Sequence, residues 1–367
     1  MPVDELSVLG ALSAPEAGPK TREENFPDLD AAYSLHPALR RKRIASAALG
    51  VVKGAGIFLF LLFAAGGSLA YAQNSPPAAP DLVPVHAIVT VEARDHDQSV
   101  PSLSNGDVMA YERRERLRVT DLLALNGDHA GLELFCLLDD SSSTSLGSHL
   151  EDLRRFIEAQ PPTTAVGVGY MRNGTVDIVQ QFTNDHSRAA QSLRLPFGTG
   201  GGAASPFLSL SDLIKRWPGN SVRREIVMVT SGVDSFGGSG PMNPYVDPAI
   251  EAALRNEIVV YAIYMPGAGH TGHSYYAMNW GQNHLAQIAD GTGGEAYMLG
   301  FESPVSIGKY LEEISAHLAH QYRVTFLMKP GNKSGLRNVR FATEVPNADL
   351  VSASSVYVPA GHAQPAR

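Results

Sequence analysis

Residues 131–143 read GLELFCLLDDSSS, an apolar run that ends in two aspartates and three serines. A run that is apolar at nearly every position, here at all but Glu133, is typical of a strand that is buried on both faces. The next segment, residues 145–160, spaces its apolar side chains as one face of a helix does: Leu146, Leu150, Leu153, Phe156 and Ile157. A buried strand followed by an amphipathic helix predicts one unit of a parallel sheet that is covered by helices.

The same alternation continues through the middle of the chain. Further apolar runs lie at residues 164–171, 176–182, 224–229, 258–265 and 295–300. Amphipathic segments lie between and after them, at residues 184–195, 205–217, 247–257, 283–290 and 303–320. The sequence therefore predicts a doubly wound α/β domain over residues 129–318, with a Rossmann-like, mostly parallel sheet and helices on both faces.

The segments on either side of this domain have a β pattern of short alternating pieces. We expect a β-strand unit over residues 84–128, with strands in VPVHAIVTVEARD and DVMAYERRERLRV. A C-terminal β unit is expected over residues 319–359, followed by a tail at 360–367. The two units are expected to pair with each other in one small flanking β domain.

The N-terminal region carries an export signal. Residues 54–72 contain no charged side chain and follow Lys53 and the basic cluster Arg40–Arg43. This predicts a signal peptide or membrane anchor at 51–72, and Ala70–Ala72 has the small-x-small form of a cleavage site.

The segments on either side of this signal, residues 1–50 and 73–83, are not expected to belong to a folded domain. Residues 1–50 are interpreted as a disordered leader, or as sequence upstream of a true start near Val51 or Val52, and residues 73–83 as a Pro-rich linker. Under either interpretation the chain after the signal segment is exported, and it is then periplasmic, secreted or anchored facing outside the cytoplasm. A membrane is a partner only through an uncleaved N-terminal segment.

Charge and cysteine content exclude several classes of function. The 367 residues carry a net charge of −8, and residues 1–72 hold seven acidic and seven basic side chains, so the rest of the chain carries the whole negative charge. Affinity for nucleic acid comes from Lys and Arg that neutralise phosphates, so no nucleic-acid partner is expected. The single cysteine, Cys136, excludes an intramolecular disulfide framework and a zinc–thiolate site.

Motifs of common enzymes are absent from the sequence as well. There is no G-x-S-x-G nucleophile turn, and GTGGGAAS at 198–205 lacks the Gly-Lys-Ser/Thr that cradles nucleotide phosphates. We therefore expect a protein that is not an enzyme, and an exported hydrolase is the least favoured hypothesis.

The turn after the first buried strand contains the spacing D-x-S-x-S. It presents the carboxylate of Asp139 and the hydroxyls of Ser141 and Ser143 to one point, at the carboxyl end of a strand where doubly wound sheets bind ligands. Hard cations such as Mg²⁺ take oxygen ligands and retain waters, so this turn suits one. Ser and Asp are also common helix caps and turn formers, and that interpretation stays open.

The order of motifs favours the metal-site interpretation. The D-x-S-x-S turn is followed by a Gly-rich loop that enters a helix, and then by a strand that ends in Thr230-Ser231-Gly232-Val233-Asp234. With this order, residues 129–318 resemble the von Willebrand factor type A (VWA) domain, in the exported bacterial form found in acidobacteria. The resemblance implies a metal-ion-dependent adhesion site (MIDAS) built from three loops, with Mg²⁺ or Mn²⁺ as the ion.

The resemblance assigns the loops residue by residue. Asp139, Ser141 and Ser143 match the first loop, and Ser205 takes the place of the family's threonine in the second, with Thr199 as a poorer substitute. In the third loop Ser231 stands where the family has aspartate, which is expected to weaken the metal site because each ligand charge offsets dehydration of the ion. Two nearby acids, Asp234 and Asp140, are the candidates to compensate. The full set of predicted metal ligands is Asp139, Ser141, Ser143, Ser205, Ser231 and Asp234.

A second candidate lies in the aromatic segment GAGHTGHSYYAMNWGQNH, residues 267–284. His270 and His273 form H-x-x-H, with His284 further on, but the Gly content argues against the helix that would bring the first two together. We expect a long loop here, which either contacts a partner through its aromatic side chains or packs locally.

Two hypotheses of function follow. In the first, the chain is an exported VWA-like adhesion module, whose protein ligand supplies an acidic residue that completes the coordination of a Mg²⁺ or Mn²⁺ ion. In the second, it is a metal-independent structural or assembly module of the cell envelope, in which the serines form a turn and a cap. The replacement of the third-loop aspartate by Ser231 favours the second.

Overall fold

The computed structural model describes residues 82–361, apart from residues 96, 199–202, 220–222, 239, 269–273 and 299. The predictions for the leader, the signal segment and the tail after residue 361 lie outside this part of the chain. So do those for Thr199, His270 and His273. Within the described part, no helix is both long and apolar enough to cross a membrane.

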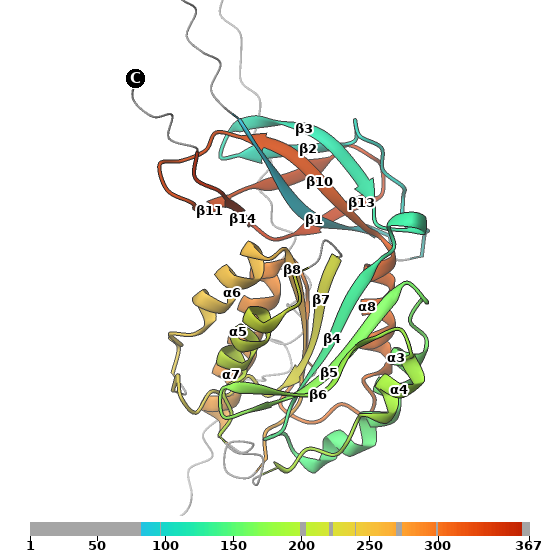
Figure 1. The fold of residues 1–367 in the computed structure, drawn as a ribbon, viewed down its shortest axis with the longest axis vertical. Coiled ribbons are helices and arrows are strands. Elements are labelled where there is room, and N and C mark those ends of the chain that lie inside the picture. Colours follow the sequence, from blue (N-terminus) through green and yellow to red (C-terminus); the bar gives the residue numbers. More distant parts are fainter. Residues whose placement is uncertain are drawn as a thin grey trace, which may run out of the picture. The chain divides into compact units, whose positions relative to one another are not determined.

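Six strands form the sheet of the α/β domain, in the order β6-β5-β4-β7-β8-β9 (Figure 1). Their bounds are β4 Leu132–Asp139, β5 Thr164–Arg172, β6 Thr175–Thr183, β7 Arg223–Thr230, β8 Ile258–Tyr264 and β9 Ala296–Tyr297. All neighbouring strands are parallel except β5 and β6, which are antiparallel. The predicted α/β class, with a mostly parallel sheet, is confirmed.

Helices cover both faces of this sheet. On one face lie α3 (Leu150–Glu158), α4 (His186–Gln191) and α8 (Gly308–Ala319), and on the other α5 (Pro206–Arg216), α6 (Val246–Arg255) and α7 (Tyr275–Thr292) (Figure 1). Every residue of β4 is buried, and alternate residues pack in opposite directions, Leu134 and Cys136 with the first set of helices and Phe135 and Leu137 with the second. This two-sided burial is why the strand reads as a continuous apolar run.

Three predicted elements differ from those observed. The helix expected from residue 145 begins as a 3-10 turn, η2 (Thr144–His149), before α3. The aromatic segment expected to be a loop is helical from Tyr275, because Ser274 caps α7 with its side chain, which accepts a hydrogen bond from the Ala277 amide. The expected strand at 295–300 is only two residues long.

The strands that precede and follow the α/β domain pair with one another. A six-stranded sheet has the order β12-β2-β3-β10-β1-β13, and a two-stranded sheet joins β11 to β14. Their bounds are β1 Val83–Ala93, β2 Val108–Glu112, β3 Glu115–Ala124, β10 Gln321–Met328, β11 Gly335–Asn338, β12 Arg340–Thr343, β13 Ala348–Ser352 and β14 Ser355–Val358. The segment DVMAYERRERLRV is a hairpin rather than one strand, and it turns at Arg113, whose φ is +52°.

The strand order fixes where a ligand would bind. From β4 the chain passes to β5 on one side, and it later reaches β7 on the other side. The loops after β4 and β7 therefore diverge at the carboxyl end of β4, which is where doubly wound sheets bind ligands. Asp139 is the last residue of β4, and the D-x-S-x-S turn therefore lies at this switch point.

Candidate functional site

Asp139 is the centre of a buried hydrogen-bond cluster. Its Oδ1 accepts from the backbone N of Ser141 at 2.9 Å and from the Ser141 hydroxyl at 2.6 Å. Its Oδ2 accepts from the hydroxyl of Thr230, the last residue of β7, at 2.6 Å. The side chain is only 1% exposed. The structure thus brings the first predicted loop and the start of the third together at one carboxylate.

Burial has an electrostatic consequence for this carboxylate. It raises the pKa of Asp139, while the hydrogen bonds from Ser141 and Thr230 act in the opposite direction. A cation bound beside the carboxylate would favour its charged form. The buried acid therefore suits a site that binds a cation.

The adjacent acid, Asp140, does not share this role. It is fully buried, and its two carboxylate oxygens accept from Nη1 and Nη2 of Arg194 at 2.7 and 3.1 Å. The Arg194 guanidinium lies 3.8 Å from the centroid of the Tyr170 ring and 4.2 Å from that of Phe197. Asp140 thus holds the loop of residues 193–198 against β4, and its charge is already matched by an arginine.

Ser205 occupies the N-cap position of α5 without capping it. The residue is 1% exposed, and its hydroxyl has no hydrogen-bond partner among the described residues. A buried hydroxyl without a partner is uncommon in native proteins, and this one is free to bind a ligand. This orphan oxygen fits the role that the family resemblance gives to Ser205.

The polar side chains of the third loop make their hydrogen bonds within that loop. The Ser231 hydroxyl accepts from the amide of Val233 at 3.3 Å. The Asp234 carboxylate accepts from the amides of Phe236 and Gly237 at 2.9 and 3.0 Å, and from the Asn243 side chain at 3.1 Å. Asp234 therefore folds its own loop, and no carboxylate of this loop makes a hydrogen bond with the Asp139 cluster within the described part of the chain.

Backbone hydrogen bonds join the loops into one surface. Ser235 donates to the carbonyl of Ala204 at 2.7 Å, which links the third loop to the second. Ser143 donates to the carbonyl of Pro266 at 3.0 Å, which links the first loop to the segment after β8. The Ser143 hydroxyl also accepts from the amide of Ser145 at 3.3 Å, so the N-cap interpretation of this serine holds beside any ligand role.

The third loop also packs closely against α7. Gly232 has a φ of +67°, and a Cβ at this position would lie 2.3 Å from the carbonyl oxygen of Gly281. Two glycines thus allow the turn after β7 to approach the helix closely. His284, one turn further along α7, is 4% exposed and meets the Phe207 ring edge-on at 5.8 Å, so it packs in the core.

The predicted donor set would suit a hard cation. Asp139 could supply one carboxylate, and Ser141, Ser143 and Ser205 could supply hydroxyls, of which that of Ser205 has no partner among the described residues. Oxygen ligands of this kind suit Mg²⁺ or Mn²⁺, but one carboxylate would hold the ion less tightly than two or three.

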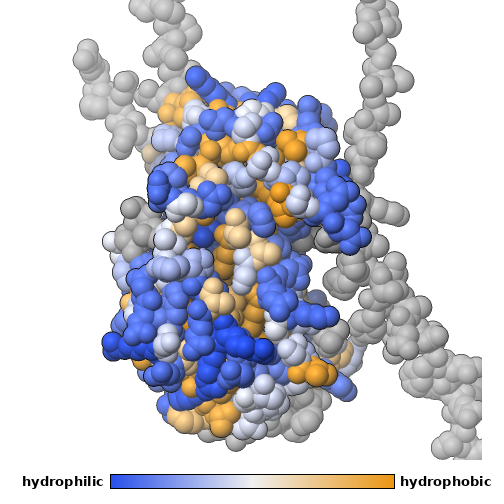
Figure 2. Space-filling model, turned by 90° about the vertical axis from the view of Figure 1, so that its right-hand side faces the viewer, coloured by the Kyte–Doolittle hydropathy of each residue, from blue (hydrophilic) through white to orange (hydrophobic). Residues whose placement is uncertain are grey.

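Exposed apolar side chains surround this end of the sheet. Ten large hydrophobic side chains are exposed in the described part of the chain, and seven of them lie in segments that adjoin the carboxyl ends of the parallel strands. These seven are Leu195, Phe197, Phe236, Met242, Tyr275, Tyr276 and Val305. We call them the apolar rim. Figure 2 shows hydrophobic groups at the lower end of one face, next to strongly hydrophilic ones.

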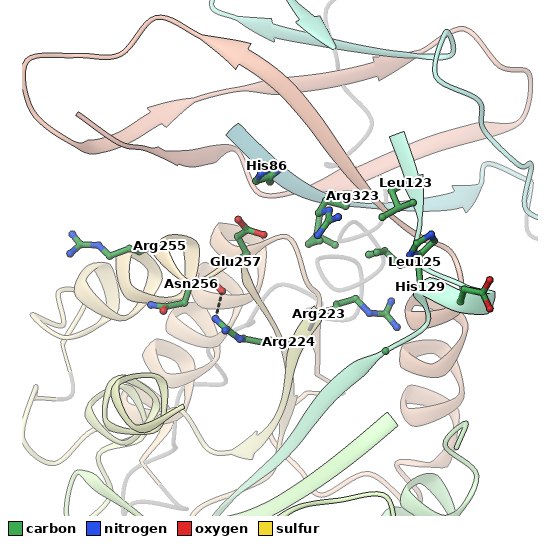
Figure 3. Close-up of a pocket in the computed structure, with 13 residues that line it drawn as sticks. His86, Leu123, Leu125, His129, Arg223, Arg224, Arg255, Asn256, Glu257 and Arg323 are labelled. Atoms are coloured by element: carbon green, nitrogen blue, oxygen red, sulfur yellow. Dashed lines mark hydrogen bonds between the residues drawn. The ribbon is translucent and has the colours of Figure 1, made fainter. Parts of the chain in front are cut away.

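A separate cavity of about 510 Å³ lies at the opposite end of β7 from Thr230. Four arginines line it, Arg223, Arg224, Arg255 and Arg323, together with two acids, Asp128 and Glu257. Figure 3 shows that β7, β10 and the end of α6 contribute the four arginines. Buried Nε atoms of Arg223 and Arg323 have no hydrogen-bond partner among the described residues. A lining of this charge can hold an anionic group, and it is distinct from the Asp139 cluster.

Two residues of the site were missed by the sequence analysis. Thr230 was part of the quoted T-S-G-V-D motif but was not proposed as a site residue, although a hydroxyl at a strand end beside an expected carboxylate was a usable signal. Arg194 gave no signal, because its partner Asp140 is 54 positions away.

Similar proteins were found among solved structures alone. No protein-family model matches the sequence, and no curated protein matches it. Among solved structures, the chain is similar to a von Willebrand factor type A protein from Catenulispora acidiphila, with 12% identity, a TM-score of 0.40, and coverage of 78% of this chain and 76% of that one.

Two proteins from Bacteroides are also similar. An aerotolerance-related membrane protein from Bacteroides fragilis has 16% identity and a TM-score of 0.37, with 51% of this chain and 98% of that chain covered. BatB from Bacteroides thetaiotaomicron has 16% identity and a TM-score of 0.36, with coverage of 52% and 98%. The solved structures that resemble this chain thus include a von Willebrand factor type A domain protein.

Proposed function

We propose that the chain is an exported interaction module that binds a protein at the carboxyl end of its α/β sheet. The observation that carries this proposal is the apolar rim around the Asp139 cluster. Soluble proteins rarely leave large apolar side chains exposed together, and such groups mark contact surfaces. Aromatic side chains and methionine, which form five of the seven rim residues, are enriched in protein interfaces.

A divalent cation is the second part of the proposal. Asp139, Ser141, Ser143 and Ser205 would hold Mg²⁺ or Mn²⁺, and the ion would attract an acidic side chain of the partner. The buried carboxylate and the unpartnered hydroxyl of Ser205 support this assignment. Because Ser231 supplies no charge, we expect the affinity for the free ion to be low and the partner's carboxylate to complete the site. Neither the rim nor this site requires catalysis, so the proposed module is not an enzyme.

Export rests on the N-terminal sequence. Residues 51–72 have the form of a signal peptide or anchor, and either one would place residues 82–361 outside the cytoplasm.

A structural or assembly role in the cell envelope, without metal, is the second candidate function. It is favoured by Ser231, whose hydroxyl is bonded within its own loop, and by the hydroxyl groups that already satisfy both oxygens of Asp139.

Calorimetric titration of the full chain with Mg²⁺ and with Mn²⁺ separates the two candidates. Under the first, saturable binding occurs in the wild type and is lost in Asp139→Ala. Asp107→Ala is the matched control, since Asp107 also accepts a serine hydroxyl, from Ser104 at 2.6 Å, but at an exposed turn. Equal titrations of all three proteins would leave the metal-independent module as the function, with the apolar rim as its binding surface.

A further inference from the structure

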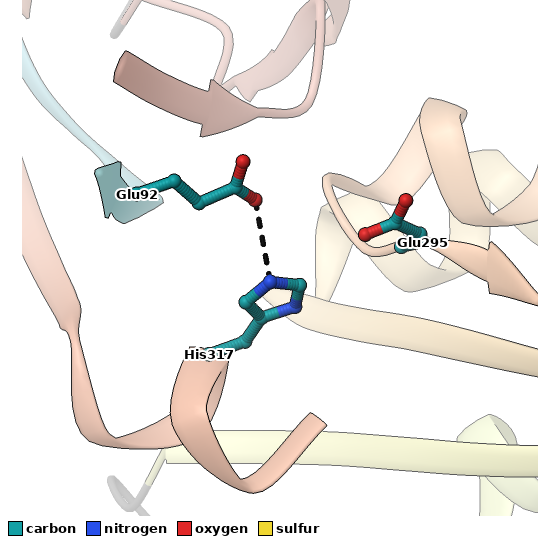
Figure 4. Close-up of side chains that lie close together, drawn as sticks. All are labelled: Glu92, Glu295 and His317. Carbon is teal, nitrogen blue, oxygen red and sulfur yellow. Dashed lines mark ion pairs between the residues drawn. The ribbon is translucent and has the colours of Figure 1, made fainter. Parts of the chain in front are cut away.

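Three side chains from distant parts of the chain converge away from the Asp139 cluster. Glu92 lies on β1, Glu295 lies just before β9, and His317 lies on α8. One ligand atom from each lies within 4.8 Å of the other two. Figure 4 shows Glu92 and His317 joined as an ion pair and the Glu295 carboxylate on the other side of the imidazole. The pair is 3.3 Å long, from His317 Nε2 to Glu92 Oε1.

The backbone around each of these residues is fixed. Val91, next to Glu92, donates to the carbonyl of His320 at 3.0 Å, which ties β1 to the end of α8. Ala262 donates to the carbonyl of Glu295 at 2.9 Å, which ties the segment before β9 to β8. His317 is 8% exposed, and its ring stacks on Tyr261 at 6.0 Å. The backbone of the cluster is therefore fixed, with His317 buried and the two glutamates half-buried.

A fourth polar group lies among these charges. The Tyr297 side chain is 6% exposed, and its hydroxyl has no hydrogen-bond partner among the described residues. Burial raises the pKa of Tyr297, and so do the charges of Glu295, Glu313 and Glu92. Its ring stacks on Tyr310 of α8 at 5.2 Å, and Tyr310, Glu313 and His317 share one face of that helix. The Tyr297 side chain thus lies close enough to these carboxylates for their charges to act on it.

We propose that Glu92, Glu295 and His317 form a binding site for a divalent transition-metal ion. One imidazole nitrogen with two carboxylates suits Zn²⁺ better than Mg²⁺ or Mn²⁺, which prefer oxygen ligands. Bonds of about 2.0–2.1 Å place neighbouring ligands of a tetrahedral zinc ion about 3.3 Å apart, and Glu92 and His317 already have this separation. Glu295 needs only a small approach to join them, and water bound to the ion would give the Tyr297 hydroxyl a partner.

The ion would have a structural role. It would join β1, the segment before β9 and α8, which are separated by up to 225 positions in the sequence. Such an ion binds the folded chain and not the unfolded one, so it raises the unfolding temperature. This site shares no residue with the Asp139 cluster, and the two are therefore tested independently.

The test is a calorimetric titration of Zn²⁺ into the full chain, with thermal unfolding measured in Zn²⁺ and in excess chelator. We expect one saturable site in the wild type and a higher unfolding temperature with the ion. Glu295→Gln and Glu92→Gln each keep the shape of the side chain and remove its charge, and each should weaken binding by at least about tenfold. The exposed-site control Glu115→Gln should bind as the wild type does.

Unfolding in chelator shows that each variant is folded before the titrations are compared. Three results would overturn the proposal. They are no saturable binding to the wild type, equal binding by the wild type and both glutamine variants, and binding lost in Asp139→Ala but kept in Glu295→Gln. The last would place the ion at the strand-end site instead.

Discussion

Replacing Thr230 by valine tests whether the Asp139 carboxylate depends on the hydroxyl groups around it. Valine keeps the shape of threonine but cannot donate the 2.6 Å hydrogen bond to Asp139 Oδ2. Thr230 and Asp139 are 0% and 1% exposed, so water cannot replace the lost donor. A hydrogen bond to a charged group contributes about 1.5–3 kcal/mol, so we expect Thr230→Val to lower the free energy of unfolding by about 2 kcal/mol at neutral pH.

Urea unfolding of the full chain, followed by circular dichroism at several pH values, measures this loss. The loss should shrink in acid, because a protonated Asp139 needs the donor less. Thr120→Val is the matched control, since Thr120 bonds to the carbonyl of Thr325 at an exposed position, and its loss should cost less than about 0.5 kcal/mol. Equal and small effects of the two substitutions would refute the view that the carboxylate is held by this cluster.

Two further predictions concern other buried charges. Arg194→Ala removes the partner of the fully buried Asp140 and should lower the free energy of unfolding in urea by about 3 kcal/mol. Arg255→Ala, which breaks the exposed pair with Glu251, should lower it by less than about 1 kcal/mol. Similar losses in the two variants would contradict the assigned role of Asp140. Burial raises the pKa of Glu225 to about 8 from 4.5, so the folded chain holds an extra proton between these values and wild-type stability should fall as the pH rises from about 5 to 8. Glu225→Gln should remove this part of the decline, and an unchanged slope would show that Glu225 is ionised in the folded chain.

Much of the α/β domain could be predicted because its signals are local. The apolar run of β4 and the helical spacing of α3 are each set by a few neighbouring residues, and both were found within one or two turns of their observed positions. The antiparallel direction of β6 was not predicted. Its signal was nevertheless present in Asn173-Gly174, whose φ values of +51° and +75° form the tight turn that such a dipeptide favours.

The candidate site was predictable only where its contacts are short in sequence. Asp139 and Ser141 are two positions apart, and the D-x-S-x-S spacing identified them. The donor from Thr230 and the salt bridge from Arg194 join residues 91 and 54 positions apart, and a single sequence carries no information on such pairs. The same holds for Glu92 and His317, which are brought together by the pairing of β1 with β10, the strand that follows α8.

The proposed binding surface is tested most directly by site-specific photocrosslinking in the native cells. A photoreactive residue in place of Met242, which is 86% exposed on the apolar rim, should capture a partner protein. The same group in place of Leu336, an exposed apolar residue on β11, should not. Capture at position 242 should be lost in the Asp139→Ala background and in excess chelator. Equal capture at the two positions, or none at position 242, would contradict it.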